Sequence, residues 1–307
     1  MSQPDQIAFL IPTRHRRSDL TCLFESFVKQ SRSPDLIMII DGGDAGKTVE
    51  DFVDSYPQFD ISYIHVDPPG LTKQRNAGLD ALPENITLVG FLDDDIELMP
   101  NAVQVMLDFW RCTEPDFGGA SFNIINNRKS RPTWIKRFFL VNGKRRGTVL
   151  KSGFNIGCQP VEHDTETEWL SGGATVWRAD IFKSYRFEER YGGYAHFDDL
   201  DFSLSLKQSY RMLVLNDAKV LHHTREVRRD KVREFSESDI VYRHMFVKRF
   251  GLSSNAFYWA VFGLILANTL VGLKERDRSK FDQIMGYISG LKQIYFDTCN
   301  VDVADLK

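Results

Sequence analysis

Four short apolar runs in the first hundred residues, each closed by turn-forming residues, constrain the fold of this chain more than any other feature. They cover residues 7–11, 36–40, 61–66 and 88–92. Segments with helical periodicity separate the runs, as in consecutive strand–helix–strand units. The pattern predicts an α/β protein with a Rossmann-like, mostly parallel central sheet that helices flank on its two faces.

Three helices are predicted between and after these strands. Ser18 is expected to cap the first helix, and residues 71–82 form the second. Pro100 stands in the expected first turn of the third. The apolar positions of the first and third helices recur at i, i+3, i+4 and i+7, so we expect them to face the core. These residues are Leu20, Leu23, Phe24, Phe27 and Val28 in the first, and Val103, Met106, Leu107 and Trp110 in the third.

Composition excludes several classes of protein. A chain of 307 residues with 42% hydrophobic and 26% charged residues is neither disordered nor a multi-span membrane protein. Its net charge of -3 argues against a nucleic-acid coat protein. Four cysteines without a C-x-x-C pair indicate neither a zinc ribbon nor a disulfide scaffold, and the first residues lack the order of a signal peptide. We therefore expect a cytoplasmic protein.

Acidic residues follow two of the predicted strands. Asp41 ends the second strand, and Asp93, Asp94 and Asp95 follow the fourth. Ligands of open parallel sheets bind at the carboxyl ends of the strands. Adjacent carboxylates repel one another, and Mg²⁺ or Mn²⁺ would offset that repulsion. A solvated acidic turn that caps the next helix fits the triplet about equally well.

A second acidic cluster, Asp198, Asp199 and Asp201, precedes an apolar helical pattern that we expect to start at Asp201. Carboxylates in a first helical turn are favourable for the helix dipole alone, so a general base is one of two interpretations. His222 and His223 follow a predicted strand end, where imidazole becomes a metal ligand only beside carboxylates.

Two further segments carry polar groups suited to a ligand. Arg75 and Asn76 could bind a phosphate or a base edge, or form a solvated helix face. The Trp169 to Gly173 segment suits a loop over a sugar or a tight turn. The chain has no G-x-G-x-x-G after the first strand, no Walker A lysine, no G-x-S-x-G and no H-E-x-x-H. Dinucleotide, P-loop, serine-hydrolase and zinc-protease interpretations therefore lose their motifs.

Five segments in order resemble family 2 glycosyltransferases of the GT-A fold: FLIPTRHRRSDLTCLFESFVKQSRSPDLIMIIDGGD, GLTKQRNAGLD, FLDDDIEL, WLSGGATVWR and FDDLDFSLSL. The resemblance covers roughly residues 7–223. It implies a metal-dependent enzyme that moves a sugar from a nucleoside-diphosphate sugar to a hydroxyl of a glycan or lipid-linked acceptor.

The resemblance also implies roles for individual residues. Asp41 would contact the base, Arg75 the base or diphosphate, Asp93 the ribose, and Asp95 with His222 the Mn²⁺ or Mg²⁺ ion. Asp199 would be the general base, and Trp169, Ser171, Gly172 and Gly173 would wall the acceptor side. Further donor contacts are expected from Pro12, Thr13, Arg17, Asn76 and Asp94.

Two departures from the family pattern leave choices open. The family commonly has D-D-G-S where this chain has Asp41 to Asp44. Asp198 stands in place of the usual glutamate, so either Asp198 or Asp199 is the base. With one base and no covalent nucleophile, the expected mechanism is a single inverting displacement.

Competing functions remain at this stage. A non-catalytic nucleotide- or glycan-binding protein would keep Asp41 and lose the base. A nucleotidyltransferase would usually show glycines with arginines after the first strand, and residues 13–17 contain the arginines but no glycine. RNA binding has only local charge in its favour, so no nucleic-acid partner is expected.

The C-terminal part differs in character. We expect a catalytic domain over residues 1–223, with a nucleotide-sugar half (1–97) and an acceptor half (98–223), and a helical region over 224–307. Residues 256–273 are an uncharged run of 18 that could span a membrane, lie on it or pack internally. Residues 128–151 carry nine Lys or Arg and no acid, as in segments that bind anionic lipid or as in a solvated loop. Together they predict contact with the cytoplasmic face of the inner membrane.

Overall fold

A computed structural model describes residues 5–43, 50–127, 133–192, 197–224 and 229–304. Contacts divide the chain into two units. The first comprises residues 1–129 and 158–224, and the second comprises residues 130–157 and 225–307. This division groups residues 130–157 with the C-terminal helices, whereas the acceptor half predicted from the sequence includes them.

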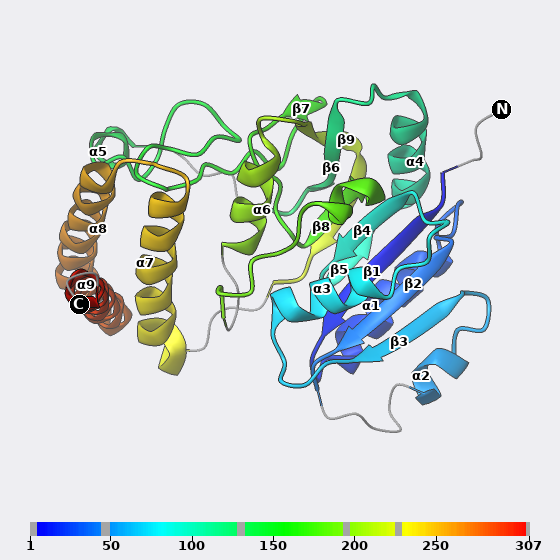
Figure 1. The fold of residues 1–307 in the computed structure, drawn as a ribbon, viewed down its shortest axis with the longest axis horizontal. Coiled ribbons are helices and arrows are strands. Elements are labelled where there is room, and N and C mark those ends of the chain that lie inside the picture. The colour runs from blue at the N-terminus through cyan, green and yellow to red at the C-terminus, as the bar shows by residue number, and fades with distance from the viewer. Residues whose placement is uncertain (1–4, 44–49, 128–132, 193–196, 225–228, 305–307) are drawn as a thin grey trace. The chain divides into compact units, whose positions relative to one another are not determined.

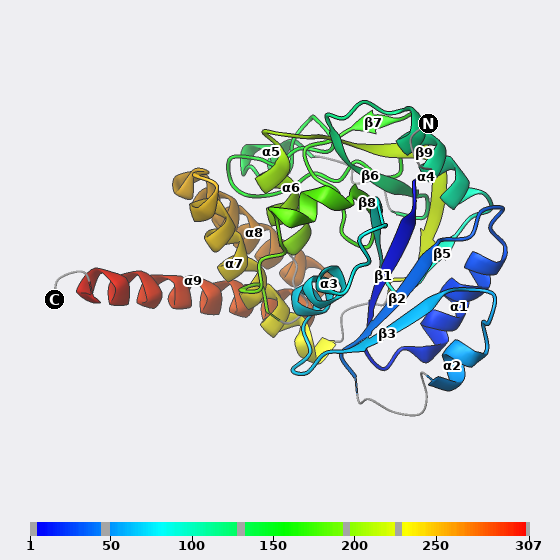
Figure 2. The ribbon, with the colours of Figure 1, turned by 45° about the vertical axis from the view of Figure 1, so that its right-hand side comes forward.

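The described part of the first unit is built on one mixed sheet (Figure 1). Its strand order is β3-β2-β1-β4-β8-β6-β9-β5, and β7 pairs with β9. The strands are β1 (Ile7–Thr13), β2 (Leu36–Asp41), β3 (Ile61–His65), β4 (Leu88–Leu92), β5 (Ile96–Leu98), β6 (Phe117–Ile124), β7 (Thr165–Glu166), β8 (Ala174–Arg178) and β9 (Arg211–His222). β1 to β4 are mutually parallel, as predicted, and β1 lies between β2 and β4. Figure 2 shows β1, β2 and β3 side by side. β8 runs antiparallel to both of its neighbours.

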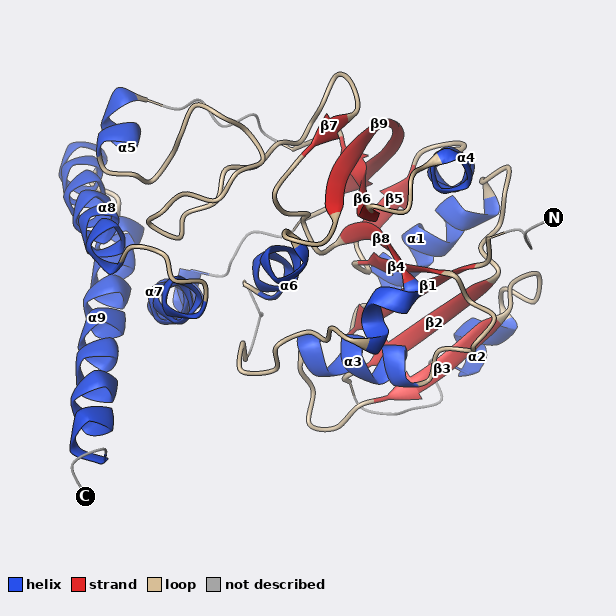
Figure 3. Cartoon of the chain, turned by 45° about the horizontal axis from the view of Figure 1, so that its top comes forward, coloured by secondary structure: helices blue, strands red, loops and turns tan. Residues whose placement is uncertain are grey.

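Helices cover the two faces of this sheet (Figure 3). The helices of the first unit are α1 (Arg17–Val28), α2 (Glu50–Asp54), α3 (Leu71–Asp80), α4 (Ala102–Cys112) and α6 (Asp198–Leu206), with a 3-10 turn, η1 (Ala179–Lys183). Alternate residues of β1 point to opposite faces, where Phe9 joins the core under α1 and α4, and Leu10 joins the core under α3 and α6. Covered on both faces, β1 is buried throughout and is apolar up to its last residue, Thr13.

Gly90 in β4 shows how closely the centre of the sheet packs. A Cβ atom at this position would lie 2.1 Å from Cδ1 of Phe9. The phenylalanine ring occupies the space that a side chain on β4 would need, so only glycine fits without a shift of the core.

Several expectations about element boundaries are wrong. Ser18 lies inside α1, whose N-cap is Arg16, and no side chain caps that helix end. Val28 is 53% exposed, although Phe27 beside it in the last turn of α1 is fully buried. α4 starts at Ala102, two residues after Pro100, and α6 starts at Asp198 rather than Asp201. The apolar face predicted for α4 is buried as expected.

The second unit is helical. It contains α5 (Trp134–Phe138), a 3-10 turn, η2 (Arg229–Lys231), α7 (Val232–Arg249), α8 (Ser254–Glu275) and α9 (Arg278–Ala304). A small core that includes Ile240, Phe257 and Ile294 joins the three long helices. The segment after α5 is tied to α7, because the Arg243 guanidinium donates to the Gly153 carbonyl at 2.8 Å.

Candidate active site

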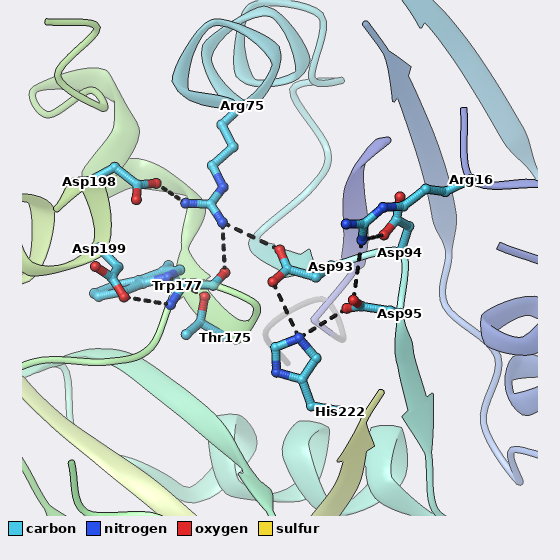
Figure 4. A network of polar contacts seen from close by, with 11 residues as sticks. Arg16, Arg75, Asp93, Asp94, Asp95, Thr175, Trp177, Asp198, Asp199 and His222 are labelled. Carbon is cyan, nitrogen blue, oxygen red and sulfur yellow. Dashed lines mark hydrogen bonds and ion pairs between the residues drawn. The ribbon is translucent and has the colours of Figure 1, made fainter. Parts of the chain in front are cut away.

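The polar side chains of the first unit converge at the carboxyl ends of β1, β4 and β9, between α3 and α6 (Figure 4). Most of the residues predicted to form the donor, metal and base sites lie in or beside this cluster. The parallel sheet brings the strand ends together, because Thr13 of β1 pairs in register with Asp41 of β2. β5 adds the far side, since Ile96 pairs with His222 directly after the acidic triplet.

The three consecutive carboxylates point in different directions (Figure 4). Asp94 turns inward, where it accepts hydrogen bonds from Thr13 Oγ1 at 2.7 Å and from Arg16 Nη1 at 2.8 Å. Burial raises the pKa of Asp94 to about 6, although both partners oppose the shift. These contacts favour a role in holding the turn together over the donor contact expected for Asp94.

Asp93, Asp95 and His222 form the second part of the cluster. Nε2 of His222 lies 3.0 Å from Oδ1 of Asp95 and 3.9 Å from Oδ2 of Asp93. Burial opposes the charge on His222, but the contact with Asp95 and the charge of Asp93 outweigh it and raise its pKa. Burial likewise opposes ionisation of Asp95, yet His222 and Arg16 lower its pKa.

These three residues fit a divalent cation. One ligand atom from each lies within 4.8 Å of the other two. Oδ1 of Asp95 is buried and, within the described ranges, makes no hydrogen bond of good geometry. Two carboxylate oxygens and one imidazole nitrogen suit Mn²⁺ or Mg²⁺, which would complete its shell with phosphate and water. The two metal ligands predicted from the sequence, Asp95 and His222, are therefore close enough to act together, and Asp93, expected at the ribose, lies beside them.

Arg75 connects the acidic triplet to α6. Its guanidinium pairs with Asp198, donates to the Gly172 carbonyl at 3.1 Å, and lies 3.7 Å from Oδ1 of Asp93. The side chains of Arg75 and Asp198 are 3% and 5% exposed, so neither reaches bulk solvent. Burial raises the pKa of Asp198, while Arg75 opposes the shift. The Asp198 carboxylate therefore serves as the counter-ion of the buried Arg75 guanidinium.

Asp199 occupies a different environment although it is the next residue. It is half-buried, and its carboxylate accepts hydrogen bonds from the backbone N–H groups of Gly172 at 3.2 Å and Leu200 at 2.7 Å. Burial, followed by the charge of Asp198, raises its pKa to about 7. A carboxylate with this pKa is suited to exchange protons near neutral pH.

The loop before β8 contacts Asp93 through Gly173 and Asp199 through Gly172. The Gly173 carbonyl accepts a hydrogen bond from the Asp93 N–H at 2.9 Å. A Cβ atom at Gly173 would lie 2.2 Å from Oδ2 of Asp93, so a side chain there would displace the carboxylate. Trp169 and Ser171 are half-buried in the same loop, whose acceptor-side role stays a prediction.

The remaining donor-site predictions fall in three settings. Asp41 is buried at the end of β2, where it accepts from the Gly43 N–H at 2.7 Å and from the Tyr63 hydroxyl at 3.2 Å. Pro12 is buried in β1, and Arg17 is exposed on α1. Asn76 uses its amide to bind the Phe187 backbone at 3.0 Å, which favours a structural role.

Arg16 is a site residue that the sequence analysis did not single out. Besides Asp94, it contacts Asp95 Oδ2 at 3.2 Å. Its position shortly after the carboxyl end of the first strand, where ligands of such sheets bind, is the sequence signal that could have indicated it. His223 turns away from the cluster to Glu97, at 2.9 Å. Asp44 lies outside the described residues.

Comparison with known proteins identifies relatives in sequence and in fold. The family described as glycosyl transferase family 2 matches residues 8–161. A minor teichoic acid biosynthesis protein, GgaA of Bacillus subtilis (strain 168), is 30% identical over 109 residues, which are 34% of this chain and 24% of that protein. The chain thus aligns with about a quarter of the length of this curated relative.

Solved structures of similar fold share little sequence with the chain. A mannosyltransferase from Pyrobaculum calidifontis, in complex with GDP-Man and Mn²⁺, gives a TM-score of 0.57 at 11% identity over 94% of this chain and 89% of that one. TarS 1–349 of S. aureus, in complex with UDP-GlcNAc, gives 0.51 at 15% identity over 93% and 89%. GalNAc-T7 with UDP, GalNAc and Mn²⁺ gives 0.55 at 14% identity over 78% and 48%. The predicted GT-A fold is confirmed.

Proposed function

The chain belongs to glycosyl transferase family 2, and from that premise we propose that it transfers a sugar from a nucleoside-diphosphate sugar to a hydroxyl group of a cell-envelope glycopolymer or its lipid-linked precursor, with inversion at the anomeric carbon. One observation carries the proposal. The Asp93, Asp95 and His222 cluster lies at the carboxyl end of β4, and Arg75 links it to the α6 turn that bears Asp199.

The donor side of the site is suited to a diphosphate. A cation held by Asp95, His222 and Asp93 would neutralise the charge that develops on the departing nucleoside diphosphate. Asp41, held by the Gly43 N–H and the Tyr63 hydroxyl, is positioned at the strand end to contact the nucleoside. The nucleotides in the matched structures, GDP-Man and UDP-GlcNAc, support this class of donor and leave the base open.

Asp199 is the proposed general base. The backbone N–H groups of Gly172 and Leu200 orient its carboxylate, and its pKa of about 7 allows it to accept the proton of an acceptor hydroxyl as that oxygen attacks the sugar. Asp198 is a positioning residue, because its carboxylate is paired with Arg75. This assignment chooses between the two candidates that the sequence leaves open.

A single displacement requires one base and a leaving group on the opposite face of the sugar. The proposed donor and base groups belong to different elements, β4 and β9 on one side and α6 on the other, with the Gly172 and Gly173 backbone between them. This arrangement favours inversion over a two-step route through a covalent intermediate. The teichoic acid relative supports a cell-envelope polymer as the acceptor.

The test combines ligand-dependent stability with product analysis. The purified protein is heated with UDP, GDP or dTDP, each with Mn²⁺ or with EDTA. A nucleotide at one hundred times its dissociation constant adds about 2.7 kcal/mol to the unfolding free energy. We expect one nucleotide to stabilise the protein with Mn²⁺ only.

Matched carboxylate variants show whether Asp95 is responsible for the Mn²⁺-dependent stabilisation by the nucleotide. Asp95→Asn should abolish the stabilisation, whereas Asp108→Asn, at a carboxylate 57% exposed on α4, should keep it. Stabilisation by no nucleotide, or equal stabilisation of Asp95→Asn, contradicts the proposed donor site. Proton NMR of the fresh product gives the anomeric configuration, and retention would contradict the single displacement.

A further inference from the structure

We infer that the second unit docks on an anionic lipid bilayer through one apolar face, here called the α5–α8 face. It consists of large apolar side chains between 39% and 75% exposed: Trp134, Ile135, Phe138, Tyr258, Trp259, Phe262, Leu266, Leu270 and Leu273. The inference concerns membrane binding, goes beyond the proposed function, and does not depend on catalysis.

The face is continuous because α5 packs on the first turns of α8 (Figure 1). The Phe138 and Trp259 rings lie 5.4 Å apart, and the Trp259 indole donates to the Phe138 carbonyl at 2.9 Å. Five exposed residues of α8, from Trp259 to Leu273, follow one another at intervals of three or four and form a single stripe along the helix. An exposed apolar patch of this extent is typical of a binding surface.

The opposite side of α8 packs inside the second unit. Phe257 and Val261 are fully buried in the core shared with α7 and α9. Of the two polar residues in the middle of the helix, Asn268 faces α9, where it donates to Gln283 at 3.0 Å. Thr269 lies beside the stripe but is half-buried, and its hydroxyl donates within the helix to the Ile265 carbonyl at 2.8 Å. The five residues that define the stripe are all apolar.

This two-sided packing distinguishes among the three settings considered for residues 256–273. By length and composition α8 can cross a membrane, with a mean hydropathy of 1.8 over its most apolar window. Crossing would strip Phe257 and Val261 of their core contacts and break the bond between Asn268 and Gln283. A purely internal helix would leave no apolar stripe exposed. A helix that lies in the membrane interface keeps the internal contacts and buries the stripe.

Charge identifies the lipid. Residues 133–151, which form α5 and the loop after it, contain six basic residues and no acid: Lys136, Arg137, Lys144, Arg145, Arg146 and Lys151. Trp134, Trp259 and Tyr258 are residue types that favour the headgroup region. A second copy of the chain is a poorer occupant, because a twofold contact would place two copies of the basic segment in one interface. Anionic headgroups match both features, as at the cytoplasmic face of the inner membrane predicted from the sequence.

The test is flotation of the full-length protein with vesicles of phosphatidylglycerol and phosphatidylcholine, compared with phosphatidylcholine alone. We expect binding to the anionic vesicles that weakens as NaCl is raised. Lys144→Gln with Arg145→Gln should weaken the partition about 25-fold, since each basic residue near an anionic surface contributes roughly fivefold. Leu266→Gln with Leu270→Gln should weaken it at least tenfold, because both side chains would lose apolar burial.

Matched controls separate this surface from general effects. Val28→Gln, at an apolar side chain 53% exposed on α1, and Lys183→Gln, at an exposed lysine of η1, should bind like the wild type. Asp95→Asn should also bind like the wild type, so a failure of the proposed function leaves this result intact. Absence of binding to anionic vesicles at low salt would overturn the inference. Vesicle binding by the Leu266→Gln, Leu270→Gln variant that equals the binding of the wild type would also overturn it. A third contrary result would be a wild-type oligomer in the absence of lipid that only this double variant dissociates, while vesicle binding persists.

Discussion

Asp198→Asn and Asp199→Asn each exchange one carboxylate for an amide, at neighbouring positions, and we expect them to fail in opposite ways. Asp198→Asn leaves the buried Arg75 guanidinium without its counter-ion. Removal of one partner of a buried ion pair costs about 3–5 kcal/mol of unfolding free energy. Because Arg75 keeps the Gly172 carbonyl at 3.1 Å and Asp93 at 3.7 Å, we expect the lower end of that range.

Asp199→Asn should leave stability unchanged or higher at pH 8. The folded-state pKa of Asp199, about 7, lies above its ordinary value, so the folded protein holds this proton more tightly than the unfolded chain. Ionisation of Asp199 therefore opposes folding as pH rises from about 4 through 7. The amide removes that opposing charge.

Asp199→Asn, the more stable of the two variants, should nevertheless lose its activity through the loss of the general base. A general base contributes about 10²- to 10⁴-fold to turnover, so Asp199→Asn should lose at least a hundredfold in kcat with an intact fold. The kcat/KM of the wild type should rise with pH and level off above about pH 7, where Asp199 is ionised. That rise should vanish in Asp199→Asn.

Urea unfolding followed by tryptophan fluorescence, together with initial rates across pH 5–9, measures both effects. Asp217→Asn, at a carboxylate 72% exposed, is the matched control and should match the wild type in both assays. If Asp199→Asn keeps kcat within tenfold of the wild type and retains the pH dependence, the base is assigned to the wrong residue. Equal stability of Asp198→Asn and the wild type would refute the account of the buried pair.

Three further substitutions test other parts of the first unit. Gly173→Ala places a Cβ 2.2 Å from Oδ2 of Asp93, so kcat should fall at least tenfold in a folded protein, and rates with circular dichroism check this. Gly90→Ala overpacks the core against Phe9 and should lower the unfolding free energy by about 1–3 kcal/mol in urea titration. Asp41→Ala removes the acceptor held by the Gly43 N–H, so KM for the donor should rise more than kcat falls, and donor-saturation kinetics measure the split.

The first half of the fold could be predicted because its signals are local. β1 to β4 are short apolar runs, and the stripe of α4 that includes Val103 and Trp110 shows in its spacing. β6 and β8 were missed, and only the end of β9 before His222 was predicted, because the pairing of these strands is set at a distance. β8 lies antiparallel between β4 and β6, and no nearby residue pattern encodes that order. β5 is three residues long, too short for any periodicity.

The sequence was enough to predict that acidic residues gather at the strand ends. It was not enough to predict which role each of these residues has. Asp198 and Asp199 are consecutive in the first turn of α6, so the helix turns their side chains about 100° apart. Only the three-dimensional contacts show that Asp198 faces Arg75 while Asp199 faces the Gly172 N–H. Arg16 was missed for the same reason, since its partner Asp94 lies 78 positions away in the chain.

The grouping of residues 130–157 with the last helices has a consequence for the order of events during synthesis. The sheet of the first unit ends at His222, so its strands can all pair once that residue has left the ribosome. α5 and its loop emerge much earlier, yet Trp259 and Arg243, which they contact, are made 121 and 90 residues after their partners. During that interval the aromatic residues of α5 lack their contacts with α8, and exposed apolar surface of this kind makes a nascent chain prone to aggregation.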